Sequence, residues 1–395
     1  MPTHLSPGWR RDFSEGRLET LKGVQLASPA VDVARNRLCL GTPDGHLECM
    51  TASGGQTLWR KRIPPRKAGQ EGTPLNLEAA AAVAEAEADK EKIRRTSSHS
   101  AIFDGGQLIV GTDDGLLLCL DSASGEEIWR YEVPGALIRK PLLVKDRVVF
   151  VDGTNTVYAL DRNTGAWVWQ VQRPPPAEFA LSSEGAPASD GERVYVGFSD
   201  GHLVALSLQD GAQIWKRDLA PEHDKFEDVD ATPQVINGTL YAASAASALY
   251  ALDPSTGDVR WTQPIEGIVG LHAFQGDLIA STDRSTVIRL SGHDGSRRWR
   301  LRYPGGAANE AVTAGQYVVV TLAEIGLQFI NPHTGQPIQR FNPGHGVSAP
   351  ATVTPEGHVY FVGDGGVLYS LVHRKTGPGR STRSEAPFGH YGLDN

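Results

Sequence analysis

The chain has 395 residues, 40% of them hydrophobic, and a formal net charge of −8 with acidic and basic residues interspersed. This distribution excludes the basic stripe of a nucleic-acid-binding protein and a polybasic membrane patch. No apolar stretch approaches the roughly 18 residues of a membrane-spanning helix, and residues 1–5 lack the apolar region of a signal peptide. The chain as written therefore predicts a cytoplasmic protein, or a periplasmic one if an export leader has been removed.

A frame of the form Asp-x-x-Thr-Gly-x-x-x-Trp, complete or altered, recurs along the chain, with its fullest copies at residues 161–169 and 253–261. The unit of about 40 residues excludes short solenoid repeats and is typical of a four-stranded propeller blade. A large aromatic side chain at a fixed place in each unit predicts packing between neighbouring blades. The tryptophans in this set are Trp9, Trp59, Trp129, Trp169, Trp215, Trp261 and Trp299.

Upstream of the frame, alternating apolar and polar residues predict a hairpin in each unit. In the fourth unit, residues 193–197 and 202–206 flank Ser199-Asp200-Gly201, whose Asp and Gly favour a tight turn. In the frame itself, we expect the Asp carboxylate to accept backbone N–H bonds and the Gly to adopt a left-handed conformation.

The first and last units complement each other. The eighth frame stops at Thr376-Gly377, whereas residues 8–13 match residues 214–219 of the fourth unit. Residues 5–13 are therefore predicted to complete the last blade, which removes exposed sheet edges. We predict an all-β fold, an eight-bladed β-propeller of four-stranded antiparallel blades closed by the N-terminal strand. Residues 1–377 form one domain, and residues 378–395 are expected to be a disordered tail.

One long insertion interrupts the repeat between Gly55 and Gly125. Its composition predicts a helix within an insertion of about 64–97, and the alanine-rich stripe of that helix either packs on the propeller or contacts a partner. Two long loops, 173–179 and 221–230, belong to one rim of the disc. The candidate partner surface comprises Leu77, Ala84, Phe179 and Phe226.

The first residues of the innermost strands are expected to face the central channel. They form a mixed-charge ring at one mouth, which is a candidate site for a small polar ligand; the alternative is a water-filled channel whose charges satisfy one another. The residues are His99, Arg139, Lys140, Glu184, Asp230, His272 and Glu310.

The three cysteines, Cys39, Cys49 and Cys119, all lie in strand patterns. An odd number without close pairing predicts free core thiols, which suits a reducing compartment. Metal-ligand spacings of His or Cys, a Gly-x-Ser-x-Gly elbow and a phosphate loop are absent from the sequence. We therefore expect no catalytic residues, no metal and no cofactor.

The repeated frames resemble the pyrroloquinoline-quinone-type propeller repeat, and eight copies over nearly the whole chain resemble the BamB family of outer-membrane assembly factors. The resemblance implies a periplasmic lipoprotein scaffold that binds the central outer-membrane insertase. Quinone-dependent alcohol dehydrogenases share the repeat, but the Cys-Cys pair that they place beside the cofactor has no counterpart here.

Two hypotheses follow. The first is a non-catalytic scaffold that binds a protein partner of unidentified kind and is a monomer outside its complex, without nucleic acid or a membrane span. The second is an enzyme or small-ligand sensor that uses the channel mouth. Convergent acids and bases at the mouth favour the second hypothesis, and an apolar groove at the rim favours the first.

Overall fold

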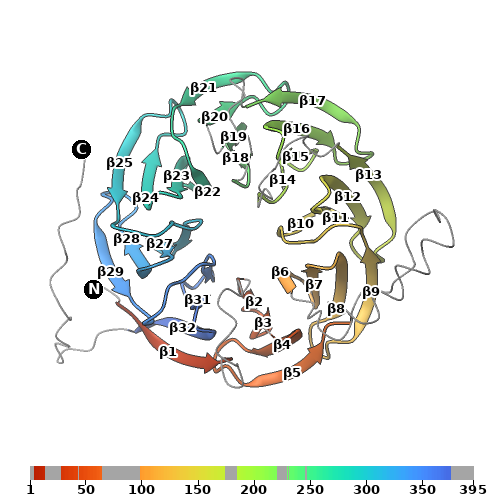
Figure 1. Ribbon diagram of the computed structural model, residues 1–395, viewed down its shortest axis with the longest axis vertical. Helices are drawn as coiled ribbons and strands as arrows, with labels where there is room; N and C mark the ends of the chain where they lie inside the picture. The colour runs from red at the N-terminus through yellow and green to blue at the C-terminus, as the bar shows by residue number, and fades with distance from the viewer. Residues whose placement is uncertain are drawn as a thin grey trace, which may run out of the picture.

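The computed structural model describes residues 4–13, 28–42, 44–64, 98–173, 185–219, 229, 231–244 and 247–374. Within them, eight four-stranded antiparallel sheets surround a central opening as the blades of a propeller (Figure 1). The predicted eight-bladed fold is confirmed. The predicted helix, Phe179, Phe226 and the C-terminal tail lie outside the described residues. Of the insertion and the two long loops, Pro64, Arg173 and Val229 are described.

The strands are numbered along the chain, and we number the blades in the same direction. Blade 1 contains β2 (Ala30–Asp32), β3 (Arg37–Gly41), β4 (His46–Thr51) and β5 (Thr57–Arg62). Blade 2 contains β6 (Ser98–Asp104), β7 (Gln107–Thr112), β8 (Leu116–Asp121) and β9 (Glu127–Glu132). Blade 3 contains β10 (Leu142–Val144), β11 (Arg147–Val151), β12 (Thr156–Asp161) and β13 (Trp167–Gln172). Blade 4 contains β14 (Ala188–Ser189), β15 (Arg193–Gly197), β16 (His202–Ser207) and β17 (Gln213–Asp218).

Blade 5 contains β18 (Gln234–Ile236), β19 (Thr239–Ala243), β20 (Leu249–Leu252) and β21 (Val259–Gln263). Blade 6 contains β22 (Ile268–Phe274), β23 (Asp277–Thr282), β24 (Thr286–Leu290) and β25 (Arg297–Arg302). Blade 7 contains β26 (Val312–Ala314), β27 (Tyr317–Leu322), β28 (Gly326–Ile330) and β29 (Pro337–Phe341). Blade 8 contains β30 (Thr352–Val353), β31 (Val359–Val362), β32 (Val367–Arg374) and β1 (His4–Asp12).

The repeated frame forms the turn that leads into each outermost strand. In blade 3, Asp161 Oδ1 accepts hydrogen bonds from the backbone N–H groups of Asn163 (3.1 Å) and Thr164 (2.9 Å), and Gly165 has a φ of 71°. The third and fourth strands then pair with a bulge in the middle, which directs the repeat tryptophan into the space between two blades. Local sequence therefore sets both the turn and the direction of the indole.

Each repeat tryptophan packs on the frame glycine of the following blade. An added Cβ at these seven glycines would lie within 2.6–2.9 Å of the indole, and their φ values of 67–76° also disfavour side chains. Each indole N–H donates to a backbone carbonyl of the same turn at 2.8–3.3 Å. Five of the indoles are buried, whereas Trp9 and Trp261 are partly buried.

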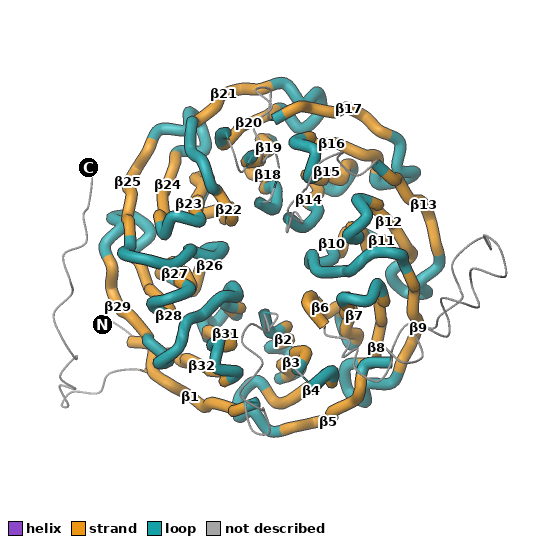
Figure 2. The backbone as a smooth tube through the Cα atoms, in the orientation of Figure 1, coloured by secondary structure: helices purple, strands orange, loops and turns teal. Residues whose placement is uncertain are grey.

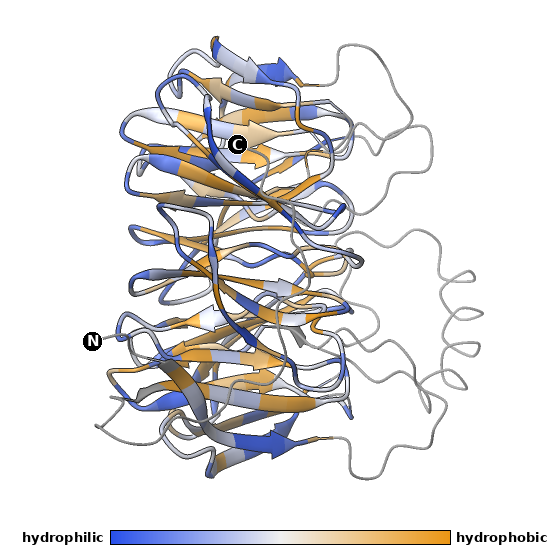
Figure 3. Ribbon diagram, turned by 90° about the vertical axis from the view of Figure 1, so that its left-hand side faces the viewer, coloured by the Kyte–Doolittle hydropathy of each residue, from blue (hydrophilic) through white to orange (hydrophobic). Residues whose placement is uncertain are grey.

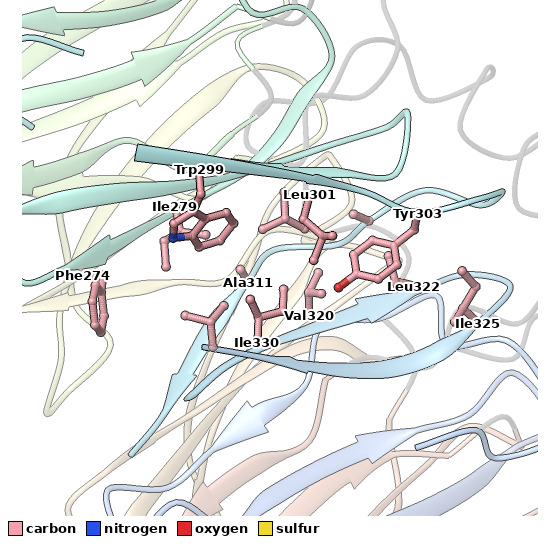
Figure 4. Packing of buried hydrophobic residues seen from close by; sticks show 13 residues of the cluster. Phe274, Ile279, Trp299, Leu301, Tyr303, Ala311, Val320, Leu322, Ile325 and Ile330 are labelled. Carbon is pink, nitrogen blue, oxygen red and sulfur yellow. The ribbon is translucent and has the colours of Figure 1, made fainter. Parts of the chain in front are cut away.

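The space between two blades is filled mainly by apolar side chains. Between blades 6 and 7, Trp299 and Leu301 of β25 lie in one buried cluster with Val320 and Ile330 of blade 7 (Figure 4). Seen from the side, hydrophobic segments lie within the blades, and hydrophilic segments lie at turns and in parts of some strands (Figure 3). The core is thus divided among the interfaces between blades.

The ring closes between the two ends of the chain, as predicted. Strand β1 pairs antiparallel with β32, with Leu5 opposite His373 and Asp12 opposite Val367 (Figure 1). Trp9 then packs on blade 1 like the other repeat tryptophans. Arg11 donates to the carbonyl oxygen of Gly55 (3.2 Å) and forms an ion pair with Glu48 (2.7 Å). Because these contacts reach into blade 1, the N-terminal strand joins blade 8 to blade 1.

The interface between blades 7 and 8 lacks a tryptophan for a structural reason. Gln339 occupies the tryptophan position, and Leu5, four residues before Trp9, occupies the position that is a glycine in the other blades. The Gln339 side chain accepts from Leu5 N–H (3.1 Å) and donates to Leu5 C=O (2.6 Å). The Leu5 side chain is buried in the same interface. Where the two chain ends meet in blade 8, both the tryptophan position and the glycine position of this interface therefore carry a different residue.

The prediction of three free thiols is wrong for two of them. Cys39 and Cys49 lie opposite each other on β3 and β4, with a Cα–Cα distance of 4.1 Å, and form a disulfide. Cys119 is free and buried, and burial raises the pKa of its thiol to about 12. The sequence did contain a signal for the pair, because Cys39 and Cys49 lie five residues before and five residues after Asp44, the first residue of the Asp-Gly turn.

Candidate functional site

One lysine and one glutamate lie at the same level of the central channel, on opposite blades. Lys140 lies two residues before β10 in blade 3, and Glu310 lies two residues before β26 in blade 7, so they occupy equivalent places. These strands lie on opposite sides of the central opening (Figure 2). At this level, blades 1, 2, 4, 5, 6 and 8 place the uncharged residues Ser28, Ser100, Ala186, Thr232, Gly270 and Pro350.

Glu310 is held against the neighbouring blade rather than projecting freely. A Cβ on Gly270 of blade 6 would lie 2.6 Å from Glu310 Cα and 2.9 Å from its Cβ, so only glycine leaves room for this residue. Burial raises the pKa of Glu310 to about 7, and the opposing charge of Lys140 acts in the other direction. Among the described charged residues, Lys140 is the one whose charge acts on this carboxyl group.

The other described residues of the predicted ring lie elsewhere. His272 pairs with Ile279 and thus lies two residues further along the channel than Lys140 and Glu310. Its Nε2 is 3.2 Å from Thr313 Oγ1, and burial lowers the pKa of its imidazole. Arg139 is buried, with 6% exposure, whereas its neighbour Lys140 is exposed.

Three further members of the predicted ring contribute no described side chain. His99 lies in β6, where only the backbone is described, and Glu184 and Asp230 fall outside the described residues. Of the four predicted residues whose side chains are described, Lys140 and Glu310 share one level of the channel. Sequence reasoning had placed His272 and Arg139 at the same level because it set the starts of the inner strands one or two residues away from the observed register.

The two rims of the disc differ in the length of their loops. On one rim, all turns from the first to the second strand of a blade, and from the third to the fourth, are described and short. The opposite rim carries the connections between blades, including residues 65–97, 174–184 and 220–228, which lie outside the described residues. The candidate partner residues Leu77, Ala84, Phe179 and Phe226 all belong to these connections.

The described residues provide no metal site and no helix suited to a membrane. No group of three or more His, Cys, Asp or Glu side chains in them is arranged to hold a metal ion. None of their secondary-structure elements is a long apolar helix able to cross a bilayer.

The geometry defines a class of protein: a closed eight-bladed propeller built from pyrroloquinoline-quinone-type repeats. The chain belongs to the family described as outer membrane protein assembly factor BamB, whose sequence model matches residues 43–301. BamB of Yersinia pestis is 28% identical over 216 residues, which is 52% of this chain and 54% of the relative. BamB of Shewanella oneidensis is 26% identical over 245 residues, 59% of this chain and 60% of the relative.

The curated relatives are thus matched over only about half of their length. Among solved structures, BamB of Moraxella catarrhalis superposes with a TM-score of 0.71 at 23% identity, covering 93% of this chain and 99% of that one. At this identity, the superposition supports the fold alone.

Proposed function

We propose that this protein is a non-catalytic scaffold that binds a protein partner during outer-membrane protein assembly. The observation that carries the proposal is the family match over residues 43–301, because the relatives in that family are described as outer membrane protein assembly factors. The family resemblance implies the central outer-membrane insertase as the partner. The protein is a monomer outside this complex.

We place the protein in the periplasm. The Cys39–Cys49 disulfide supports this location, because disulfides persist in oxidising compartments such as the bacterial periplasm. The description of the relatives also favours it over the cytoplasmic location expected from the first residues.

We place the partner surface on the rim that carries the connections between blades. The opposite rim offers short turns, which leave little chain to vary, and binding residues are concentrated on loops held by a rigid scaffold. Leu77, Ala84, Phe179 and Phe226 are the proposed contacts.

Co-purification with the periplasmic domains of the insertase tests the proposal. Replacement of residues 66–96 by a short Gly/Ser loop, and the pair Phe179→Ala and Phe226→Ala, should abolish or weaken capture while circular dichroism stays β-rich. Trp167→Ala is the matched control, because Trp167 is 56% exposed on the outermost strand β13, away from this rim. Unchanged capture by both rim variants would refute the placement, and failure of the unaltered protein to bind would refute the scaffold role.

A small polar ligand at the channel mouth is the second candidate function. The opposed Lys140 and Glu310 favour it, because a zwitterion presents the complementary charges. Calorimetric titration with small amino acids, compared between the unaltered protein and Glu310→Gln, tests this candidate. We expect no saturable binding of pyrroloquinoline quinone with calcium, and micromolar binding with dye-linked dehydrogenase activity would replace the scaffold with a quinoprotein.

A further inference from the structure

A pocket of about 310 Å³ between blades 5 and 6 is lined by three arginines. Arg300 and Arg302 come from the outermost strand of blade 6, and Arg284 comes from the turn between β23 and β24. The loop from β21 to β22 forms the facing wall with Ile265 and Glu266. Both this loop and the turn between β23 and β24 belong to the rim that carries the connections between blades.

The register of β25 directs two of these arginines to the pocket. Arg300 pairs with Ile288 and Arg302 with Thr286, both of which also line the pocket. Trp299 and Leu301 alternate with them and pack on blade 7 instead (Figure 4). Because successive side chains of a strand point to opposite faces, Arg300 and Arg302 must share the face turned towards blade 5.

The pocket has more positive than negative charge. Arg284 lies 3.4 Å from Glu266, but neither Arg300 nor Arg302 forms a hydrogen bond or ion pair with any described residue. The lining contains three guanidinium groups and one carboxylate, that of Glu266, so its net charge is two positive charges. The residues equivalent to Arg300 in blades 1 and 2 are Arg60 and Arg130, which pair with Asp44 and Glu127 respectively. Blade 6 is therefore distinctive in leaving both positions cationic and unpaired within the described chain.

We propose that this pocket binds a dianionic phosphate monoester, carried either by a small ligand or by a lipid headgroup. Guanidinium groups bind phosphate through paired, charge-assisted hydrogen bonds, which makes arginine suited to this ligand. A phosphate monoester has a charge of about −1.5 to −2 at neutral pH and so balances the excess. A single carboxylate balances only half of it.

The small-ligand source is tested by calorimetric titration of the full chain with glycerol 3-phosphate at low ionic strength. Arg300→Ala combined with Arg302→Ala should weaken binding by about tenfold or more, because two charge-assisted contacts are lost. Arg297→Ala combined with Arg298→Ala is the matched control on the same strand, and it should change affinity by less than about twofold, since surface charges contribute weakly at a distance. Glu266→Gln should tighten binding, because Arg284 loses its competing carboxylate.

The lipid source is tested by flotation with vesicles containing phosphatidic acid, against vesicles of phosphatidylcholine alone. Binding of glycerol 3-phosphate that depends on Arg300 and Arg302 identifies a small-ligand site, and binding confined to phosphatidic acid vesicles, with the same dependence, identifies a headgroup site. Absence of binding to both probes, or equal loss in the control pair, overturns the proposal. Tighter binding of a glutamate-rich peptide than of either phosphate probe also overturns it, in favour of a protein contact.

A fourth variant tests whether the alanine pair loses binding merely because it fails to fold. Arg300→Lys combined with Arg302→Lys keeps the charge and the strand but removes the planar fork, so it should bind more weakly than the unaltered protein and better than the alanine pair. If the lysine variant binds as tightly as the unaltered protein, positive charge alone explains the binding, and the proposal is contradicted. Capture of the insertase is measured separately, so failure here leaves the scaffold role intact.

Discussion

The ion pair between Arg11 and Glu48 is expected to stabilise the closure of the ring. Arg11 belongs to β1, the N-terminal strand of blade 8, whereas Glu48 lies in β4 of blade 1. Glu48 is buried, with 1% of its side chain exposed, so Arg11→Ala leaves a carboxylate in the interior without its nearest cation. The effect should therefore exceed that of an ordinary surface substitution.

The magnitude follows from what remains around Glu48. Loss of one partner of a buried pair costs about 3–5 kcal/mol. Here the cost is reduced because Arg11 is 34% exposed, Thr57 Oγ1 still donates to Glu48 Oε1 at 2.7 Å, and Arg60 Nε lies 3.9 Å from Oε2. We expect about 2 kcal/mol from the pair and about 1 kcal/mol from the lost hydrogen bond to Gly55.

Arg217→Ala is the matched control, because Arg217 makes the same bond to the frame glycine of the next blade. Its Nε donates to Gly257 C=O at 2.7 Å, and its ion-pair partner Asp258 is 75% exposed. An exposed pair contributes about 0–1 kcal/mol, so the control should cost about 1 kcal/mol in total, chiefly through the hydrogen bond.

Urea unfolding followed by tryptophan fluorescence measures both variants, and Glu48→Gln in the Arg11→Ala background should recover part of the loss by removing the unpaired charge. Equal costs for Arg11→Ala and Arg217→Ala, or no recovery in the double variant, would refute the reasoning.

Three further predictions concern the blades and the channel. Trp169→Ala should lower the free energy of unfolding by about 3–5 kcal/mol, because the indole is 4% exposed, whereas Trp167→Ala should stay within about 0.5 kcal/mol; comparable urea midpoints would contradict this. Gly257→Ala should cost more than Gly105→Ala, since both have positive φ but only the Cβ at Gly257 would meet an indole, at 2.7 Å; equal thermal midpoints would count against the packing argument. The pKa of Glu310 is raised from its ordinary 4.5 to about 7, so its contribution to stability is full below the lower value and is lost as the pH rises through the higher one. Glu310→Gln should flatten this decline between pH 5 and pH 8, and an unchanged pH profile of the urea midpoint would show that another group is responsible.

The sequence alone was sufficient for the architecture. The frame glycines and tryptophans recur at fixed spacing, and each acts within its own turn or on the next blade, so a local pattern defines a repeated structure. The similarity between residues 8–13 and 214–219 also predicted the ring closure, which the pairing of β1 with β32 confirms. The sequence also showed that Gln339 stands where the other units have a tryptophan. It did not show why, because the hydrogen bonds between Gln339 and Leu5 form only once the N-terminal strand brings Leu5 to the place of the frame glycine.

Only the tertiary structure decided which side chains meet across the molecule. Lys140 and Glu310 lie across the channel from each other at one level because their blades are opposed and their strands start in the same register, whereas a shift of two residues moves His272 to another level. Arg300 and Arg302 open into a pocket because the alternation of β25 sends Trp299 and Leu301 to the opposite face. Contacts of this kind depend on ring geometry and strand register, which bring together residues that no short sequence pattern connects.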